Sequence, residues 1–203
     1  EETTKAIYSK TDADVRRALG KSGHLDVNDF MALISPAATP YLEVMARLSQ
    51  KYTMERFGKT ISMFVPLYIT NSCTNSCVYC GFHISNPMKR TILTEEEIIN
   101  EYKAIKRLAP FENLAKPYFS NLQIEVMPLK TEEYKELTNH GLNGVICFQE
   151  TYNKANYKIY HPRGMKSKFE WRVNGFDRMG QAGVHKIGMG VLIGLEEWRT
   201  DVT

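Results

Sequence analysis

The sequence predicts an α/β protein with a helical N-terminal extension. Residues 1–60 carry helical patterns, apolar stretches of strand length follow from residue 61 onward, and these stretches alternate with amphipathic helices. Strands that alternate with helices imply right-handed crossovers and a parallel sheet, either a barrel or a doubly wound sheet. We therefore divide the chain into an extension, residues 1–60, and an α/β core, residues 61–203.

The first sixty residues are expected to be helical. Two short stretches, Thr11–Leu19 and Asp26–Ile34, are amphipathic. A longer helix is expected to begin at Thr39, because Pro40 suits the first turn of a helix, and to end at Gly58. Its apolar residues recur at spacings of four, three and four: Tyr41, Met45, Leu48 and Tyr52.

Beyond residue 60 the pattern changes to strands that alternate with helices. Apolar segments are expected to form the strands: residues 61–69, 122–127, 144–149 and 184–194. A capping box of Thr94 and Glu97 begins one helix, and a second helix covers Thr131–Asn139. A capping box of Ser167 and Glu170 begins a third helix.

One part of the core is too short for a barrel. Only twelve residues separate the helix that ends near Ala109 from the strand that begins at Leu122, where a barrel would need another strand and another helix. We therefore predict that a segment is absent between about Leu114 and Ala115. The chain also stops at Thr203, where another helix is expected to begin, so we expect further units of the barrel to be missing.

The composition is that of an ordinary soluble globular protein, with 43% hydrophobic and 24% charged residues. The formal net charge is only +3 and the basic residues are scattered, which argues against nucleic-acid binding. The apolar stretches are too short for a membrane span, and no basic segment with a hydrophobic run indicates a secretory signal. Clustered cysteines in such a chain indicate metal or redox ligands in a reducing compartment, so we expect a cytoplasmic protein.

A short loop, NSCTNSCVYCGF, contains three of the four cysteines: Cys73, Cys77 and Cys80. Thiolates are soft ligands that suit zinc or iron-sulfur clusters. A zinc site would need a fourth ligand, such as His83 or Cys147, and would normally present a second pair of cysteines that this chain lacks. An iron-sulfur cluster held by three cysteines leaves one iron open to an exchangeable ligand. We favour the cluster, with a zinc-binding module as the alternative.

The C-x3-C-x2-C spacing, with Tyr79 before the last cysteine and Gly81 after it, resembles the radical S-adenosylmethionine (radical SAM) superfamily. The resemblance implies a partial or full (βα)8 barrel of the TIM type, with a 4Fe-4S cluster held by the three cysteines. It also implies that S-adenosyl-L-methionine binds the open iron and that Tyr79 lies against its adenine. Reductive cleavage of S-adenosyl-L-methionine would then generate a 5′-deoxyadenosyl radical.

Longer stretches resemble one branch of this superfamily, the tyrosine lyases or 2-iminoacetate synthases of thiamine thiazole biosynthesis. They cover residues 68–98, 122–129, 148–152 and 169–195. The resemblance implies cleavage of the Cα–Cβ bond of L-tyrosine to 2-iminoacetate (dehydroglycine) and p-cresol. It further implies a reductant such as flavodoxin or ferredoxin, and thiazole synthase as a partner. The alternatives within the superfamily are the tyrosine lyase of hydrogenase maturation and enzymes related to biotin synthase.

Residues at the carboxyl ends of the strands are the candidate cofactor ligands, because a barrel carries its chemistry on this face. Glu150 follows the strand GVICFQ, and the resemblance assigns it to the amino or ribose groups of S-adenosyl-L-methionine. The resemblance assigns Arg172 to the methionyl carboxylate and Ile193 to packing against adenine. A solvated strand end, an exposed helical arginine and ordinary core packing are the corresponding structural alternatives. We assign no catalytic residue.

Other features are expected to be structural, and one departs from the superfamily. Cys147 lies inside an apolar strand and is expected to be a buried hydrophobe. Lys166 and Lys168 are expected on a solvated loop, and His161 lies near the inferred face, where it could serve the substrate. The superfamily places a Gly-Gly-Glu-like segment at the end of the second strand, and this chain lacks it in the gap expected near Leu114.

Overall fold

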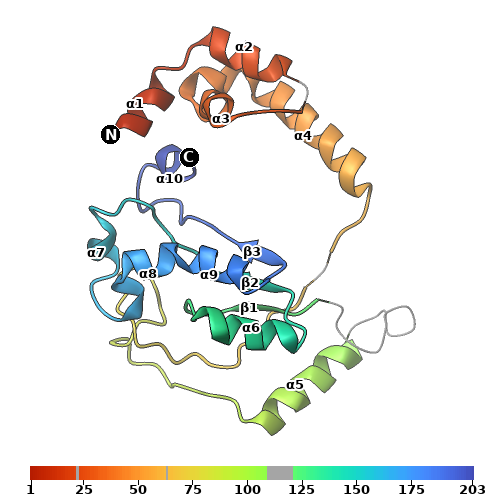
Figure 1. Ribbon diagram of the computed structural model, residues 1–203, viewed down its shortest axis with the longest axis vertical. Coiled ribbons are helices and arrows are strands. Elements are labelled where there is room, and N and C mark those ends of the chain that lie inside the picture. The colour runs from red at the N-terminus through yellow and green to blue at the C-terminus, as the bar shows by residue number, and fades with distance from the viewer. Residues whose placement is uncertain (22, 63, 109–120) are drawn as a thin grey trace. The chain divides into compact units, whose positions relative to one another are not determined.

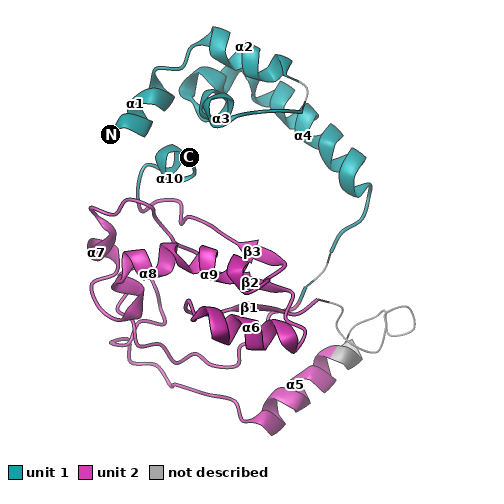
Figure 2. Ribbon diagram, in the orientation of Figure 1, with its two compact units in different colours: residues 1–64, 196–203 teal, residues 65–195 magenta. Residues whose placement is uncertain are grey.

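The chain forms two compact units (Figure 2) in a computed structural model that describes residues 1–21, 23–62, 64–108 and 121–203. Unit 1 comprises Glu1–Phe64 and Glu196–Thr203, and unit 2 comprises Val65–Leu195. The segment expected to be absent between Leu114 and Ala115 lies outside the described residues. None of the helices in the described ranges has both the length and the apolar composition that crossing a membrane requires.

Unit 1 is helical (Figure 1) and contains α1 (Glu2–Tyr8), α2 (Asp12–Gly20), α3 (Val27–Ile34), the 3-10 helix η1 (Pro36–Tyr41), α4 (Leu42–Phe57) and α10 (Trp198–Asp201). Thr11 and Asp14 form a capping box that begins α2, and Asp26 and Asp29 form one that begins α3. The helices bury small apolar side chains against one another: Val15, Ala18, Ala32 and Ala38. Both short helices that the sequence predicts are therefore confirmed.

The predicted start of the long helix at Thr39 is wrong, whereas its predicted end is confirmed. Thr39 and Pro40 lie within η1, and α4 begins at Leu42. The Thr39 hydroxyl donates a hydrogen bond back to Pro36 O at 2.9 Å, so its side chain serves the 3-10 turn and does not cap the following helix. Gly58 ends α4 with a φ of 61°, a conformation that glycine adopts without the strain of a side chain.

Unit 2 is built on a parallel sheet of β1 (Gln123–Glu125), β2 (Gly144–Ile146) and β3 (Lys186–Gly188), in that order. α6 (Thr131–Asn139) follows β1 and α9 (Gly175–Gln181) precedes β3 (Figure 1), and both contribute to one apolar core. Its buried members are Tyr134, Leu142, Val145, Cys147, Met179, Ala182 and Val184. Parallel neighbours that follow the order of the chain and are joined by helices form part of a barrel wall, which confirms the predicted α/β architecture.

The remaining helices of unit 2 are α5 (Glu95–Leu108), α7 (Tyr157–Tyr160), the 3-10 helix η2 (Met165–Ser167) and α8 (Phe169–Val173). The capping box of α5 is confirmed, because Glu97 N donates to Thr94 Oγ1 at 3.3 Å and Thr94 N donates to Glu97 Oε2 at 2.8 Å. The predicted capping box at Ser167 is wrong, since its hydroxyl donates to Gly164 O at 2.7 Å within η2. Asn174 ends α8 and begins α9, so the single helix expected there is two helices.

The strand predicted for residues 61–69 is also wrong. The described residues of this segment carry no strand, and the nearest pairing is an isolated antiparallel bridge between Thr70 and Ile92. Its large apolar side chains stay in solvent, with Ile61 86%, Phe64 88% and Tyr68 69% exposed. An apolar segment becomes a strand only when a neighbouring strand satisfies its backbone groups, and the sheet provides no such partner for these residues in the described part of the chain.

The core of unit 2 gives a direct test of the fold. Met179 is 0% exposed in the core, whereas Met189 is 57% exposed beyond β3. We expect Met179→Ala to lower the free energy of unfolding by about 2–5 kcal/mol, because it leaves a cavity in a closed core. Met189→Ala is the matched control and should change it by less than about 0.5 kcal/mol. Urea unfolding monitored by circular dichroism measures both, and equal losses would contradict the described core.

Candidate functional site

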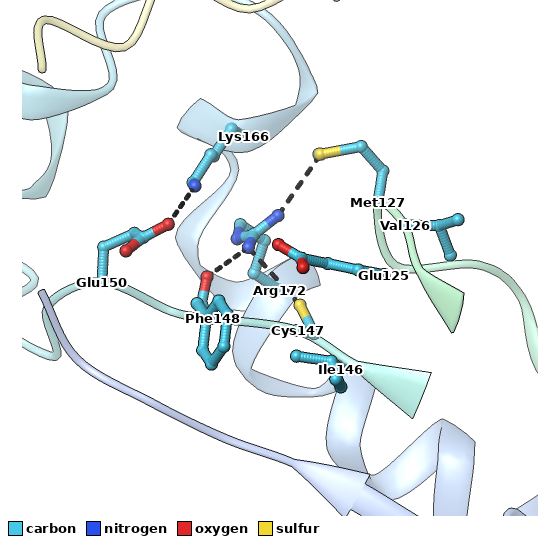
Figure 3. A pocket seen from close by; sticks show the side chains of 9 residues that line it. All are labelled: Glu125, Val126, Met127, Ile146, Cys147, Phe148, Glu150, Lys166 and Arg172. Atoms are coloured by element: carbon cyan, nitrogen blue, oxygen red, sulfur yellow. Dashed lines mark hydrogen bonds and ion pairs between the residues drawn. The ribbon is translucent and has the colours of Figure 1, made fainter. Parts of the chain in front are cut away.

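A cavity of about 160 Å³ opens at the carboxyl ends of β1 and β2 (Figure 3). Its wall is formed by residues 125–127 at the end of β1, by residues 146–148 and Glu150 at the end of β2, by Lys166 of η2 and by Arg172 of α8. In an array of parallel strands this edge is where ligands bind, because the loops that carry polar groups gather there. The cavity is therefore the candidate site.

Arg172 is the buried cation of this cavity. It is 3% exposed, and its guanidinium donates to Phe148 O at 2.6 Å and contacts the sulfur atoms of Met127 and Cys147 at 3.4 Å each. Its Nε has no hydrogen-bond partner among the described residues. Glu125 and Glu150 are the acidic groups of the wall, and neither forms an ion pair with Arg172 among the described residues.

The interpretation of Arg172 as an exposed helical arginine is therefore wrong. Burial of a guanidinium removes its hydration, and neutral carbonyl and sulfur atoms replace only part of that interaction. An anion that enters the cavity would complete the coordination of the charged group. A carboxylate suits it best, because the planar guanidinium can donate two parallel hydrogen bonds to two oxygens.

Glu150 and Lys166 form an ion pair at the edge of the cavity and point toward each other in Figure 3. Their charged atoms lie 2.6 Å apart and each side chain is only 14% exposed. Glu150 has a φ of 76°, which is unusual for a residue with a side chain and costs about 1–3 kcal/mol. The strand end holds it there, since Leu192 N donates to Glu150 O at 2.7 Å. The structure thus excludes a solvated strand end at Glu150 and a solvated loop at Lys166.

The cysteine loop, residues 71–82, is linked to the cavity through Asn75. The side-chain nitrogen of Asn75 lies 3.3 Å from Cys73 Sγ and 3.8 Å from Met127 Sδ, and Asn75 Oδ1 accepts from Lys166 N at 2.8 Å. Cys80 Sγ accepts from Phe82 N at 3.4 Å. Hydrogen bonds to sulfur stabilise thiolates and tune clusters that thiolates bind.

None of the four cysteines forms a disulfide, so each sulfur is free to act as a thiolate ligand. Burial raises the pKa of Cys77, so a bound cation is required to hold its thiolate at neutral pH. Among the described residues no three His, Cys, Asp or Glu side chains are gathered as ligands of one metal ion. The donor set fits a cluster in its chemistry, and Cys73, Cys77 and Cys80 as its ligands remain a prediction.

Tyr79 is held by a buried histidine. Burial lowers the pKa of His161 to about 4, so its ring is neutral at physiological pH. Its Nδ1 lies 3.0 Å from Tyr157 O and must donate, because a carbonyl only accepts. Nε2 is then the acceptor for the Tyr79 hydroxyl at 2.7 Å, and Lys166 Nζ lies 5.6 Å from the centre of the Tyr79 ring.

The structure brings some of the predicted cofactor residues together and leaves one apart. Glu150 and Arg172 line the cavity, and Tyr79 lies next to it beneath Lys166. Ile193 is 73% exposed and does not line this cavity. Cys147 is 2% exposed, which confirms it as a buried hydrophobe.

Sequence reasoning missed two residues of the site. Lys166 forms the ion pair with Glu150, although its lysine-rich surroundings predict a solvated loop. Arg90 stabilises the cysteine loop from outside, since its guanidinium donates to Asn71 O at 2.8 Å, Phe82 O at 3.0 Å and His83 O at 2.8 Å. No motif marks an arginine that serves carbonyl groups, so only the position of Arg90 directly after the loop could have suggested it.

Comparison with known proteins gives a curated relative, although no family model matches the chain. The chain is 45% identical over 218 aligned residues to the 2-iminoacetate synthase of Salmonella typhimurium, with 96% of this chain and 57% of the relative covered. It therefore spans a little over half the length of the curated relative it matches. The 218 aligned positions exceed the 203 residues of the chain by 15, so at least that many positions of the relative have no counterpart here.

Solved structures show the same fold. HydG, a maturase of the FeFe-hydrogenase, matches with a TM-score of 0.87 at 24% identity, covering 98% of this chain and 51% of HydG. Methylornithine synthase (PylB) matches with a TM-score of 0.64 at 18% identity, covering 100% of this chain and 62% of PylB. Both likenesses concern the fold, and they confirm the predicted fold class.

The buried histidine gives the site a pH dependence. Because the pKa of His161 is about 4 in the folded chain and about 6.5 in an unfolded one, stability is fully present above about pH 6.5 and is lost as the pH falls toward 4. In the wild type, protonation of His161 should lower the free energy of unfolding by on the order of 2 kcal/mol, and we expect His161→Gln to abolish that decrease. The measurement is the free energy of unfolding in urea at about pH 7 and about pH 4.5. His140→Gln, at an exposed histidine, is the control and should retain the wild-type loss.

Proposed function

We propose that this chain belongs to the radical SAM superfamily and acts as a carbon-carbon lyase of the 2-iminoacetate synthase type. The proposed reaction cleaves the Cα–Cβ bond of L-tyrosine to 2-iminoacetate and p-cresol, with reductive cleavage of S-adenosyl-L-methionine to methionine and 5′-deoxyadenosine. The proposed role is thiamine thiazole biosynthesis. The identity of 45% over 96% of the chain supports this choice.

The observation that carries the proposal is Arg172, a buried guanidinium that no carboxylate neutralises among the described residues. It faces a cavity at the carboxyl edge of the sheet. Met127 of the cavity wall lies 3.8 Å from the side-chain nitrogen of Asn75 in the cysteine loop. An amino-acid carboxylate is the group that this arrangement would bind best. We propose that Arg172 binds the methionyl carboxylate of S-adenosyl-L-methionine.

The other residues of the site fit the same ligand. The Glu150 carboxylate, which pairs with Lys166, can accept a hydrogen bond from an amino or hydroxyl group of the ligand. We propose Tyr79 and Ile193 as contacts to adenine, with the Tyr79 ring oriented by its bond to His161. A 4Fe-4S cluster held by Cys73, Cys77 and Cys80 would supply the electron that cleaves the ligand.

The predicted missing segment becomes part of the proposal. At least 15 positions of the relative have no counterpart in this chain, and we propose that they include the segment predicted to be absent near residues 114–115. The Gly-Gly-Glu-like segment of the superfamily would fall in that gap.

Two rival functions are less well supported. The hydrogenase maturase HydG is 24% identical to this chain, against 45% for the 2-iminoacetate synthase, so the likeness to HydG concerns the fold alone. A non-enzymatic zinc module would need a fourth ligand beside the three cysteines of the loop, and the sequence lacks the second pair of cysteines that such sites normally present.

The proposed partners follow from the reaction. A one-electron donor such as flavodoxin or ferredoxin would reduce the cluster, and thiazole synthase would receive the reactive 2-iminoacetate. Four free thiols suit a reducing compartment, which supports a cytoplasmic location.

Reconstitution tests the cluster. We expect the anaerobically reconstituted chain to bind about four irons and four sulfides, and its spectrum to change when S-adenosyl-L-methionine is added. Cys77→Ala should lose most of the iron, whereas Cys147→Ala, the matched control at the remaining cysteine, should keep it. One tightly bound zinc with no response to S-adenosyl-L-methionine would overturn the proposal. Formation of p-cresol and 5′-deoxyadenosine from tyrosine, assayed by mass spectrometry, then tests the substrate.

Substitution of the buried arginine tests the binding role. We expect Arg172→Met to raise the Kd for S-adenosyl-L-methionine by about ten- to a hundredfold, because a charged hydrogen-bonding partner of the carboxylate is lost. Arg178→Met is the control, since Arg178 also donates to backbone carbonyls, at 2.9 Å and 2.6 Å, but does not line the cavity. Calorimetric titration of the reconstituted proteins measures both. An unchanged Kd in Arg172→Met would contradict the assignment.

A further inference from the structure

Residues 157–167, which we call the bracing segment, lie against the cysteine loop. We propose that the bracing segment holds the cysteine loop in the shape that accepts the cluster, and that Gly164 is the position on which this depends. The proposal rests on the proposed function for the identity of the bound group. The contacts that carry it belong to the chain itself.

Backbone hydrogen bonds join the two segments on both sides of one proposed ligand. Ser76 N donates to Arg163 O at 3.3 Å, and Val78 N donates to Tyr160 O at 3.0 Å. Ser76 and Val78 are the neighbours of Cys77 in the chain. The backbone on either side of this cysteine is therefore held by carbonyl groups of the bracing segment, whose positions the loop cannot set by itself.

Gly164 makes the closest approach between the segments. Its φ is +89°, and a Cβ atom placed on it would lie 2.4 Å from Asn75 Oδ1, 2.8 Å from Asn75 Cα and 2.9 Å from Thr74 O. Asn75 cannot easily yield, because it is 3% exposed and its Oδ1 accepts from Lys166 N at 2.8 Å. Asn75 also contacts Cys73 Sγ at 3.3 Å, so a side chain at position 164 would displace the residue that orients this cysteine.

A second contact fixes the far end of the loop. Tyr79 precedes Cys80, and its hydroxyl bonds to His161 Nε2 at 2.7 Å. His161 is 0% exposed and stacks on Tyr157 at 4.1 Å between ring centres, and Tyr157 in turn meets Phe169 of α8 edge-on at 5.0 Å. The bracing segment is thus fixed to α8, and its contacts fix the cysteine loop relative to that helix.

The physical role of such a brace is preorganisation. A loop that must order itself when it binds a cluster loses conformational entropy at that step, and this loss weakens binding. In this chain the contacts of Ser76, Val78 and Asn75 fix the loop through groups of the protein itself, which would lower that loss. Assembly of the cluster would then depend on residues about ninety positions away in the chain, which no cysteine motif contains.

Hydrogen exchange of the cluster-free chain tests the brace without any cofactor. We expect Gly164→Ala to speed amide exchange of residues 75–79 at least about tenfold, because their acceptors move away. Gly141→Ala is the matched control: its φ is +91°, close to that of Gly164, but a Cβ there meets nothing within 4 Å. Gly141→Ala should therefore introduce the strain of a positive φ without a steric clash, and amide exchange of residues 75–79 should stay unchanged. Equal exchange in Gly164→Ala and the wild type would overturn the brace.

Iron content after anaerobic reconstitution tests its consequence for the cluster. We expect Gly164→Ala to retain less than about half of the wild-type iron and sulfide and Gly141→Ala to retain all of it. Full iron in Gly164→Ala, with faster exchange, would overturn the link between brace and cluster while leaving the proposed function intact. A wild-type chain that takes up no iron would instead overturn the proposed function and the cluster-binding role together.

A second pair of variants keeps the test valid if Gly164→Ala does not fold. His161→Phe keeps the size of the ring but removes both hydrogen bonds, whereas His161→Gln can restore a bond to Tyr79. We expect loss of iron in His161→Phe and its recovery in His161→Gln, with circular dichroism confirming that both are folded. Equal iron in the two variants would show that His161 is not a positioning residue, and that arm of the brace would be overturned.

Discussion

The arrangement of unit 2 depends on the burial of one cation, Arg172. Its guanidinium starts from α8 and reaches Phe148 O after β2 and Met127 Sδ after β1, so a single side chain joins a helix to the ends of two strands. A charge that is 3% exposed is stable only if polar atoms replace its hydration, and here the carbonyl and sulfur atoms do so incompletely. This deficit makes the cavity attractive to an anion, and it explains why one arginine can serve both the fold and the proposed ligand.

The cysteine loop depends on contacts from segments distant in sequence. Arg90 stabilises one side of it through loop carbonyls, and the bracing segment stabilises the other through Gly164 and His161. Lys166 belongs to the same segment and pairs with Glu150, so the polar wall of the cavity and the loop share one support. A change in the bracing segment would therefore affect both the proposed cluster and the proposed binding of S-adenosyl-L-methionine.

The described part of the chain holds a short parallel sheet. The chain spans 57% of a 2-iminoacetate synthase and 51% of HydG, and the described sheet has the strands β1, β2 and β3. Residues 61–69 are apolar like a buried strand, yet the large apolar side chains of Ile61, Phe64 and Tyr68 are exposed, because the sheet offers this segment no neighbour in the described part of the chain. The cysteine loop that follows them is nevertheless ordered, since its contacts come from the bracing segment and do not require a strand before it.

The sequence by itself determined the local features: the capping box at Thr94, the two short helices α2 and α3, the parallel α/β pattern, and the cysteine spacing that indicates a cluster. These depend on residues within a few positions of one another, which a sequence displays directly. Only the tertiary structure decided that residues 61–69 are not a strand, that Ser167 turns back to Gly164, and that Ile193 stays exposed. It also decided the burial of Arg172 and the contact of Gly164 with Asn75, because pairing, desolvation and close approach arise between segments far apart in the chain.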